Sequence, residues 1–174
     1  MSISQVSVIL VMGVSGVGKT TIGLLLAEHL GWQFRDGDDF HSPENIARMA
    51  QGTALTDVDR LPWLLAMQQA IASWLATDTL TVLACSALKS EYRQLLTQGS
   101  DRVQVVYLKA SFELIQRRLR QRQGHYMDAS LLPSQFAALE EPADSLQVDA
   151  SQKPAAIVTE IIATLGVGPD SAAR

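Results

Sequence analysis

Eight consecutive residues near the amino end combine three glycines, a lysine and a threonine at fixed spacing. They are Gly13, Val14, Ser15, Gly16, Val17, Gly18, Lys19 and Thr20, and they match the pattern GxxxxGK(S/T). The glycines allow successive backbone N–H groups to converge on phosphate oxygens. Lys19 can neutralise the β- and γ-phosphates of a nucleotide, and the Thr20 hydroxyl can bind Mg²⁺. An apolar strand pattern before the loop and an amphipathic helix pattern after it are the context that this interpretation requires.

The scarcity of asparagine in the chain helps to predict which nucleotide is bound. Guanine recognition usually employs an NKxD-type motif, which begins with asparagine. The only asparagine in the chain is Asn45, and Ile46 follows it. The sequence therefore favours ATP, bound together with Mg²⁺.

A pair of carboxylates follows the second predicted strand. Asp36 and Asp38 are separated by a glycine, and in a parallel sheet they would lie at the same edge as the phosphate loop. One carboxylate can serve the Mg²⁺ ion while the other orients or deprotonates an attacking hydroxyl. We assign the metal to Thr20 and Asp36 and the hydroxyl to Asp38, although these two roles could be exchanged. His41 could donate a hydrogen bond to a polyol or cap the next helix.

Composition excludes several classes of function. The chain has 174 residues and a formal charge of −4, which argues against nucleic acid and anionic membranes as partners. Eight of the 14 basic side chains fall within residues 89–122, which is consistent with a site for a small anion or with a solvated helix face. The single cysteine, Cys85, excludes an internal disulfide framework. Without a membrane-spanning run or a signal-peptide pattern, the protein is predicted to be cytoplasmic.

Strand and helix patterns alternate along the chain and must position these groups. Strands are predicted at residues 6–12, 32–35, 80–85, 103–108 and 146–148. Helices are predicted at residues 20–30, 43–50, from Pro62 onward, after Ser111, at 133–140 and at 154–165. The alternation predicts a single α/β domain over residues 1–174, with three α/β/α layers around a mostly parallel sheet. Residues 166–174 are expected to fray.

Four segments resemble the gluconokinase family of small phosphate-loop kinases, which is related to shikimate kinase. They are DGDDFHSPENIARMAQGTALTDVDRLPW at 36–63, CSALKSEYR at 85–93, RLRQRQGHY at 118–126 and QFAALEEP at 135–142. Together with the phosphate loop, the resemblance covers roughly residues 6–165. Ala54 departs from the family pattern, which has proline at this position.

The resemblance implies a five-stranded kinase fold and a defined reaction. The family transfers the γ-phosphoryl group of ATP to the 6-hydroxyl of D-gluconate, producing 6-phospho-D-gluconate and ADP. The resemblance also suggests a homodimer. Two other hypotheses are a kinase of another small hydroxy acid, such as shikimate, and an ATP-binding module without catalysis. The acceptor carboxylates Asp36 and Asp38 argue against the second of these.

The family motifs also suggest which residues meet each substrate. Gluconate carries a carboxylate, for which Arg60, Lys89 and Arg93 are candidate cations, with ordinary surface solvation as the alternative. Ser86 follows the third strand and could contact the acceptor. Arg118 and Arg122 are four residues apart and are expected to meet phosphate charge beneath a mobile lid at residues 123–135.

Overall fold

The chain folds around one sheet of five parallel strands. The computed structural model describes residues 5–122 and 129–169. The strands lie in the order β2-β3-β1-β4-β5, and every neighbouring pair is parallel. Their bounds are Val8–Met12 for β1, Gln33–Asp36 for β2, Thr81–Ala84 for β3, Val103–Lys109 for β4 and Leu146–Asp149 for β5. The predicted α/β fold with a five-stranded parallel sheet is confirmed.

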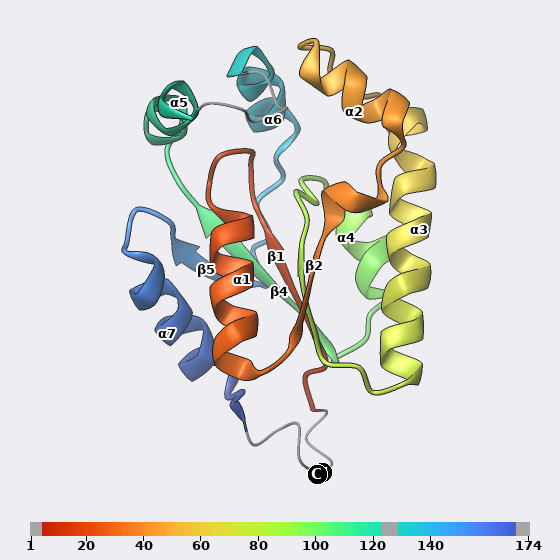
Figure 1. Ribbon diagram of the computed structural model, residues 1–174, viewed down its shortest axis with the longest axis vertical. Coiled ribbons are helices and arrows are strands. Elements are labelled where there is room, and N and C mark those ends of the chain that lie inside the picture. The colour runs from red at the N-terminus through yellow and green to blue at the C-terminus, as the bar shows by residue number, and fades with distance from the viewer. Residues whose placement is uncertain (1–4, 123–128, 170–174) are drawn as a thin grey trace.

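Helices cover both faces of this sheet (Figure 1). Helix α1 (Lys19–Leu30) and helix α7 (Pro154–Leu165) pack together on one side, and α3 (Asp57–Ala76) and α4 (Ser90–Thr97) on the other. Side chains alternate along a strand, so β1 contributes buried residues to both faces of the sheet. Ile9 and Val11 join the cluster beneath α1 and α7, whereas Leu10 and Met12 join the cluster beneath α3 and α4. The predicted three layers are therefore present.

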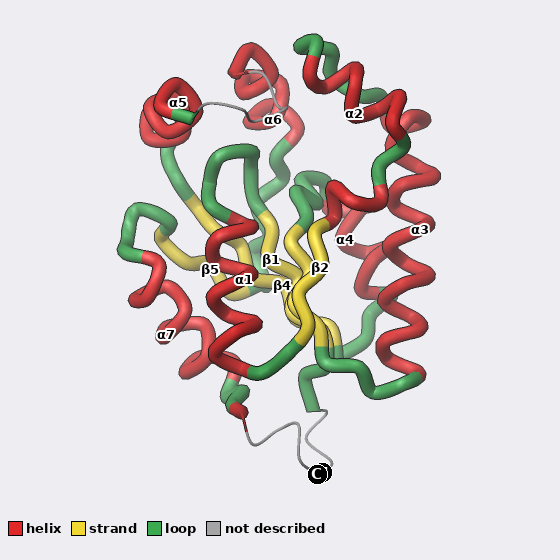
Figure 2. Tube along the Cα trace, viewed as in Figure 1, coloured by secondary structure: helices red, strands yellow, loops and turns green. Residues whose placement is uncertain are grey.

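Three further helices stand above the carboxyl ends of the strands (Figure 2). They are α2 (Pro43–Ala50), α5 (Phe112–Gln121) and α6 (Leu132–Ala138), with the short 3₁₀ turns η1 (Gly37–Phe40) and η2 (Ala129–Leu131) beside them. The loops that carry the predicted site residues lie at this end of the sheet. No described helix has the combination of length and apolar character that crossing a membrane requires.

Two element predictions need correction. The helix expected to begin at Pro62 begins at Asp57, because Thr56 and Asp59 form a reciprocal capping box that starts the first turn earlier. Pro62 then lies inside α3. Helix α4 was not predicted, because its buried face is short and includes a buried arginine, Arg93, which hides the apolar periodicity.

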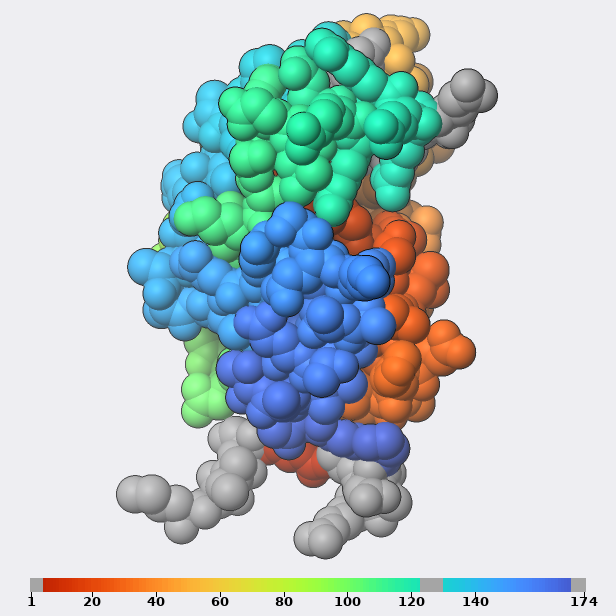
Figure 3. Space-filling model, turned by 90° about the vertical axis from the view of Figure 1, so that its left-hand side faces the viewer, coloured from red at the N-terminus to blue at the C-terminus, as the bar shows by residue number. Residues whose placement is uncertain are grey.

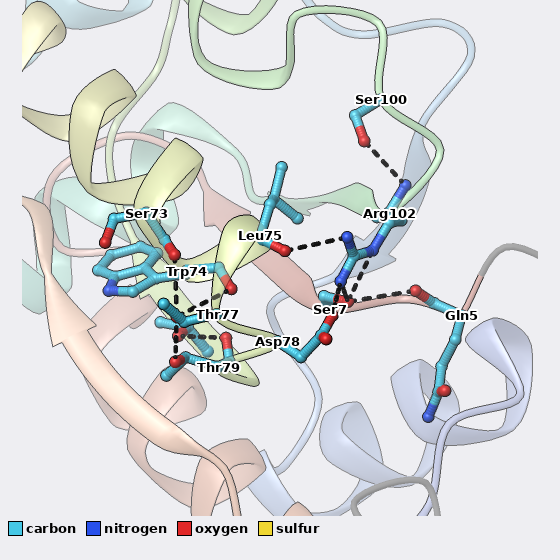
Figure 4. A network of polar contacts seen from close by, with 11 residues as sticks. Gln5, Ser7, Ser73, Trp74, Leu75, Thr77, Asp78, Thr79, Ser100 and Arg102 are labelled. Carbon is cyan, nitrogen blue, oxygen red and sulfur yellow. Dashed lines mark hydrogen bonds and ion pairs between the residues drawn. The ribbon is translucent and has the colours of Figure 1, made fainter. Parts of the chain in front are cut away.

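Arg102 ties the elements together at the opposite end of the sheet (Figure 4). Its Nε and Nη2 atoms donate to Ser7 Oγ at 3.1 and 2.9 Å, and Nη1 donates to the backbone oxygen of Leu75 at 3.1 Å. Nη2 also contacts Asp78 Oδ1 at 2.6 Å. The network joins the start of β1 to the end of α3, far from the loops that carry the predicted site. We therefore assign Arg102 a structural role.

Candidate active site

The phosphate loop connects β1 to α1, as the motif predicts. Gly16 has a φ of 83°, and a Cβ atom there would lie 2.9 Å from a methyl carbon of Leu119. Gly13 has a φ of 151°, and its Cβ would lie 3.0 Å from the backbone oxygen of Leu108. Both positions thus need glycine for backbone conformation and for space. The loop is fitted closely against β4 and α5.

Lys19 is folded back onto its own loop. Its Nζ atom donates to the backbone oxygen of Val14 at 3.0 Å. Burial lowers the pKa of Lys19, and the nearby carboxylates Asp38 and Asp36 oppose that shift. A buried ammonium group next to a neutral carbonyl gains strongly from an anion placed beside it. A phosphate group beside Lys19 would supply such an anion.

The acidic pair meets the phosphate loop at the end of β2. Thr20 Oγ1 donates to Asp36 Oδ2 at 3.0 Å, and the backbone N–H of Asp38 donates to Asp36 Oδ1 at 2.9 Å. Asp36 therefore joins the loop hydroxyl to the turn η1, which carries Asp38. Thr20 and Asp36 present hard oxygen atoms next to each other, and this donor set suits Mg²⁺.

A hollow, named here the first hollow, opens between the phosphate loop and α3. It is lined by Ser15, Lys19, Thr20, Asp36, Asp38, His41, Arg60, Trp63, Ser86, Tyr92, Arg122 and Gln135, among others. The structure thus brings together most of the side chains predicted from separate segments of the sequence. Ser86 also contributes its backbone oxygen, which accepts a hydrogen bond from the N–H of Gly13 at 3.3 Å.

His41 is held in the first hollow by an aromatic stack. Its ring lies 4.2 Å from the Trp63 ring, with an interplanar angle of 9°. Trp63 is itself fixed, because its indole N–H donates to the backbone oxygen of Gly37 at 2.7 Å. Burial, with a further contribution from the charge of Arg60, lowers the pKa of His41 to about 4. The imidazole is therefore neutral at physiological pH, with one donor and one acceptor nitrogen.

The three candidate cations have different surroundings. Arg60 lines the first hollow, and its Nη1 atom donates to the Tyr92 hydroxyl at 3.2 Å. Lys89 is paired with Asp57 outside the hollow lining, with Nζ 2.9 and 3.0 Å from the two carboxylate oxygens. The Tyr92 hydroxyl donates to Asp57 as well. Arg60 is therefore the cation of these three that faces the hollow.

The third candidate cation, Arg93, lies outside the first hollow. Its guanidinium donates to the backbone oxygens of Ala87, Leu88 and Glu140 at 2.9, 3.0 and 2.7 Å. The residue is only 8% exposed and does not line the first hollow. Through these three hydrogen bonds, Arg93 holds the loop after β3 in place. Arg93 supports the site structurally.

A second hollow lies on the other side of the phosphate loop, between α5 and the turn from β5 to α7 (Figure 3). Its lining includes Gly16, Gly18, Arg118, Arg122, Gln152 and Pro154. Arg118 donates to the backbone oxygens of Val17 and Ala150, at 3.1 and 2.8 Å. Helix α5 ends at Gln121, so Arg122 stands just beyond it rather than on the same helix as Arg118. Arg122 borders both hollows.

The lid prediction falls partly outside the described residues, which omit 123–128. The part that is described forms η2 and α6. Here the structure adds a site residue that sequence reasoning missed: Gln135 Oε1 accepts a hydrogen bond from the backbone N–H of Ser15 at 2.6 Å. Tyr92 was missed in the same way. Both residues belong to motif segments, QFAALEEP and CSALKSEYR, and this membership was the available signal.

The fold and the site define a kinase of the phosphate-loop class. The family model for shikimate kinase matches residues 15–166, which places the chain in that family of transferases. A probable gluconokinase of Mus musculus is 47% identical over 152 residues, covering 78% of this chain and 83% of that protein. Within the shikimate kinase family, the chain therefore belongs to the gluconokinases.

Solved structures agree with this placement. A gluconokinase from Sinorhizobium meliloti superposes with a TM-score of 0.81 and is 40% identical, covering 94% of this chain and 92% of that chain. An unliganded sugar kinase from Janibacter sp. superposes with a TM-score of 0.88, also at 40% identity, covering 95% and 98% of the two chains.

Proposed function

We propose that the protein transfers the γ-phosphoryl group of ATP to the 6-hydroxyl of D-gluconate, producing 6-phospho-D-gluconate and ADP. The observation that carries this proposal is the position of the phosphate loop between two hollows. One hollow contains the acidic pair and Arg60, and the other is bordered by Arg118 and the β5–α7 turn. The nucleoside part of ATP fits the second hollow, and its terminal phosphate then points into the first.

Thr20 and Asp36 would hold Mg²⁺ beside the nucleotide phosphates. Their oxygen atoms already lie 3.0 Å apart. When bound, the ion would neutralise charge on the β- and γ-phosphates. Lys19 and the backbone N–H groups of the loop would bind the same phosphates from the protein side.

Asp38 is the proposed base for the transfer. Both carboxylates line the first hollow, and Asp36 accepts hydrogen bonds from Thr20 and from the backbone N–H of Asp38, which suits it to the metal role. The 6-hydroxyl oxygen attacks the γ-phosphorus while the bond from that phosphorus to the bridging oxygen of ADP breaks. The hydroxyl proton passes to the Asp38 carboxylate, and ADP leaves with the bridging oxygen.

Arg60 and His41 would recognise the two polar features of gluconate. The guanidinium of Arg60 is a charged partner for the sugar-acid carboxylate, and the Tyr92 hydroxyl orients it. The neutral imidazole of His41 can exchange hydrogen bonds with the hydroxyl groups of the chain. A site built in this way rejects an uncharged polyol, because Arg60 would then lack its anion.

The test is ATP turnover on a panel of acceptors, followed as coupled ADP release. We expect D-gluconate to be phosphorylated, and sorbitol at least ~100-fold less efficiently, equivalent to about 2.7 kcal/mol. Phosphorus-coupled NMR of the product should place the phosphate on carbon 6. Efficient turnover of shikimate with no turnover of gluconate would contradict the proposal, as would nucleotide binding without transfer to any sugar acid.

A further inference from the structure

Gln135 joins two parts of the chain that lie 120 residues apart in sequence. Its side-chain oxygen accepts a hydrogen bond from the backbone N–H of Ser15 in the phosphate loop, at 2.6 Å. Both residues line the first hollow, together with Lys19 and Asp38. Neither residue is among those that line the second hollow. Gln135 therefore stands on the side of the loop where phosphoryl transfer is proposed to occur.

Two donors of the loop that line the first hollow have neutral protein oxygens as acceptors. Ser15 donates to the Gln135 carboxamide, and Lys19 donates to the backbone oxygen of Val14. Charged phosphate oxygens are stronger acceptors than carbonyl oxygens. A phosphate that enters the first hollow would therefore compete with both contacts. The carboxamide of Gln135 carries both an acceptor oxygen and an NH₂ group with two donors. Rotation about its terminal bond places the NH₂ group where the oxygen was.

The backbone that carries Gln135 is anchored beyond the end of α6. The Glu140 backbone N–H donates to the oxygen of Leu88 at 2.8 Å, and Glu140 Oε2 accepts from the N–H of Ser90 at 2.9 Å. Arg93 also donates to the Glu140 oxygen, at 2.7 Å. The segment from α6 to Glu140 thus spans from the phosphate loop to the loop after β3. The chain that follows Gln135 is therefore fixed to the loop after β3.

We propose that Gln135 binds the terminal phosphate of ATP. When ATP is bound, the carboxamide turns away from the Ser15 N–H and donates from Nε2 to an oxygen of the γ-phosphoryl group, which it holds on the acceptor side of the loop. This inference rests on the proposed function, in which ATP is the phosphoryl donor. ADP lacks the γ-phosphoryl group, so Gln135 distinguishes the triphosphate from the diphosphate.

The test compares the binding of AMPPNP and ADP by calorimetry in two variants. Gln135→Leu removes the donor, and we expect AMPPNP to bind at least ~10-fold more weakly, about 1.4 kcal/mol, while the ADP affinity changes less than ~3-fold. Gln135→Glu retains an oxygen for Ser15 but adds negative charge, so its loss of AMPPNP affinity should be larger. Ala137→Glu adds the same charge on the exposed side of α6 and should bind both nucleotides like the wild type.

Two results would overturn the inference. One is that Gln135→Leu binds AMPPNP as tightly as the wild type or more tightly. This result would mean that the phosphate replaces the carboxamide at the Ser15 N–H and gains no contact from Gln135. The other is an equal loss for AMPPNP and ADP, which would indicate that Gln135 merely supports the loop. If the wild-type protein phosphorylates gluconate but the variants give either of these results, the inference about Gln135 is wrong and the proposed function stands. A wild type that binds neither nucleotide would overturn both.

Discussion

Lys89 is paired with Asp57, with its Nζ atom 2.9 Å from one carboxylate oxygen and 3.0 Å from the other. Hydrogen bonds from Lys89 and Tyr92 lower the pKa of Asp57, so the carboxylate stays ionised at physiological pH. Arg60 lies 3.8 Å from the same carboxylate, but its side chain also lines the first hollow. Lys89 and Arg60 are therefore not equivalent candidates for binding a substrate carboxylate.

Substitution of the two cations should separate them. We expect Arg60→Met to raise the KM for gluconate at least ~10-fold, about 1.4 kcal/mol, with the KM for ATP little changed. Lys89→Met should raise the gluconate KM by less than ~3-fold, because its charge is already used by Asp57. Steady-state kinetics with gluconate and sorbitol measure both effects. An equal rise in the two variants would place Lys89 in the carboxylate site after all.

Removal of the phosphate-loop lysine should abolish turnover. We expect Lys19→Ala to reduce kcat by several orders of magnitude, because its charge meets the β- and γ-phosphates. Circular dichroism of the variant should remain that of the wild type. The kinetic measurement is ADP release at saturating gluconate. A variant that retained more than about a tenth of the rate, a loss below ~1.4 kcal/mol, would contradict the assignment of Lys19.

The two carboxylates should respond differently to amide substitution. Asp38→Asn should lower kcat more than it weakens ATP binding, because the amide cannot accept the hydroxyl proton. Asp36→Asn should instead raise the Mg²⁺ concentration needed for half-maximal activity, because Asp36 stands beside Thr20. Titration of Mg²⁺ in both variants is the measurement. The reverse pattern would show that the roles are exchanged.

His41 should make the stability of the protein sensitive to acid. Its pKa is about 4 in the folded protein, below the ordinary value of 6.5, so the unfolded chain takes up the proton first as the pH falls. Stability should therefore be full above pH 6.5 and decline progressively as the pH falls toward 4. His41→Gln should show a shallower decline over this range. Urea unfolding at a series of pH values measures the slope.

A matched control for that experiment is His29→Gln. His29 lies exposed near the end of α1, on the solvent side. We expect its substitution to leave the pH slope of the wild type unchanged. A His41→Gln protein with the wild-type slope would mean that another group causes the loss of stability in acid.

Contiguous patterns in the sequence were sufficient for much of the fold and for the phosphate loop. The motif from Gly13 to Thr20 is uninterrupted, and its neighbours are an apolar strand and a helix, so local geometry alone brings its N–H groups together. The closing helix was predicted at residues 154–165 and is found there, because Pro154 starts it and Gly166, with a φ of 63°, ends it. Such signals act over a few residues and do not depend on distant contacts.

Only the tertiary structure decided which basic and polar side chains face the first hollow. Arg60, Lys89 and Arg93 are of one charge type in the sequence, yet Asp57 holds Lys89, and three backbone carbonyls hold Arg93. Those partners come from segments up to 47 residues away. The contact between Ser15 and Gln135 spans 120 residues and has no local signal of its own. A side chain takes the direction in which its hydrogen bonds are satisfied, and for a long polar side chain those partners exist only once the distant segments have packed together.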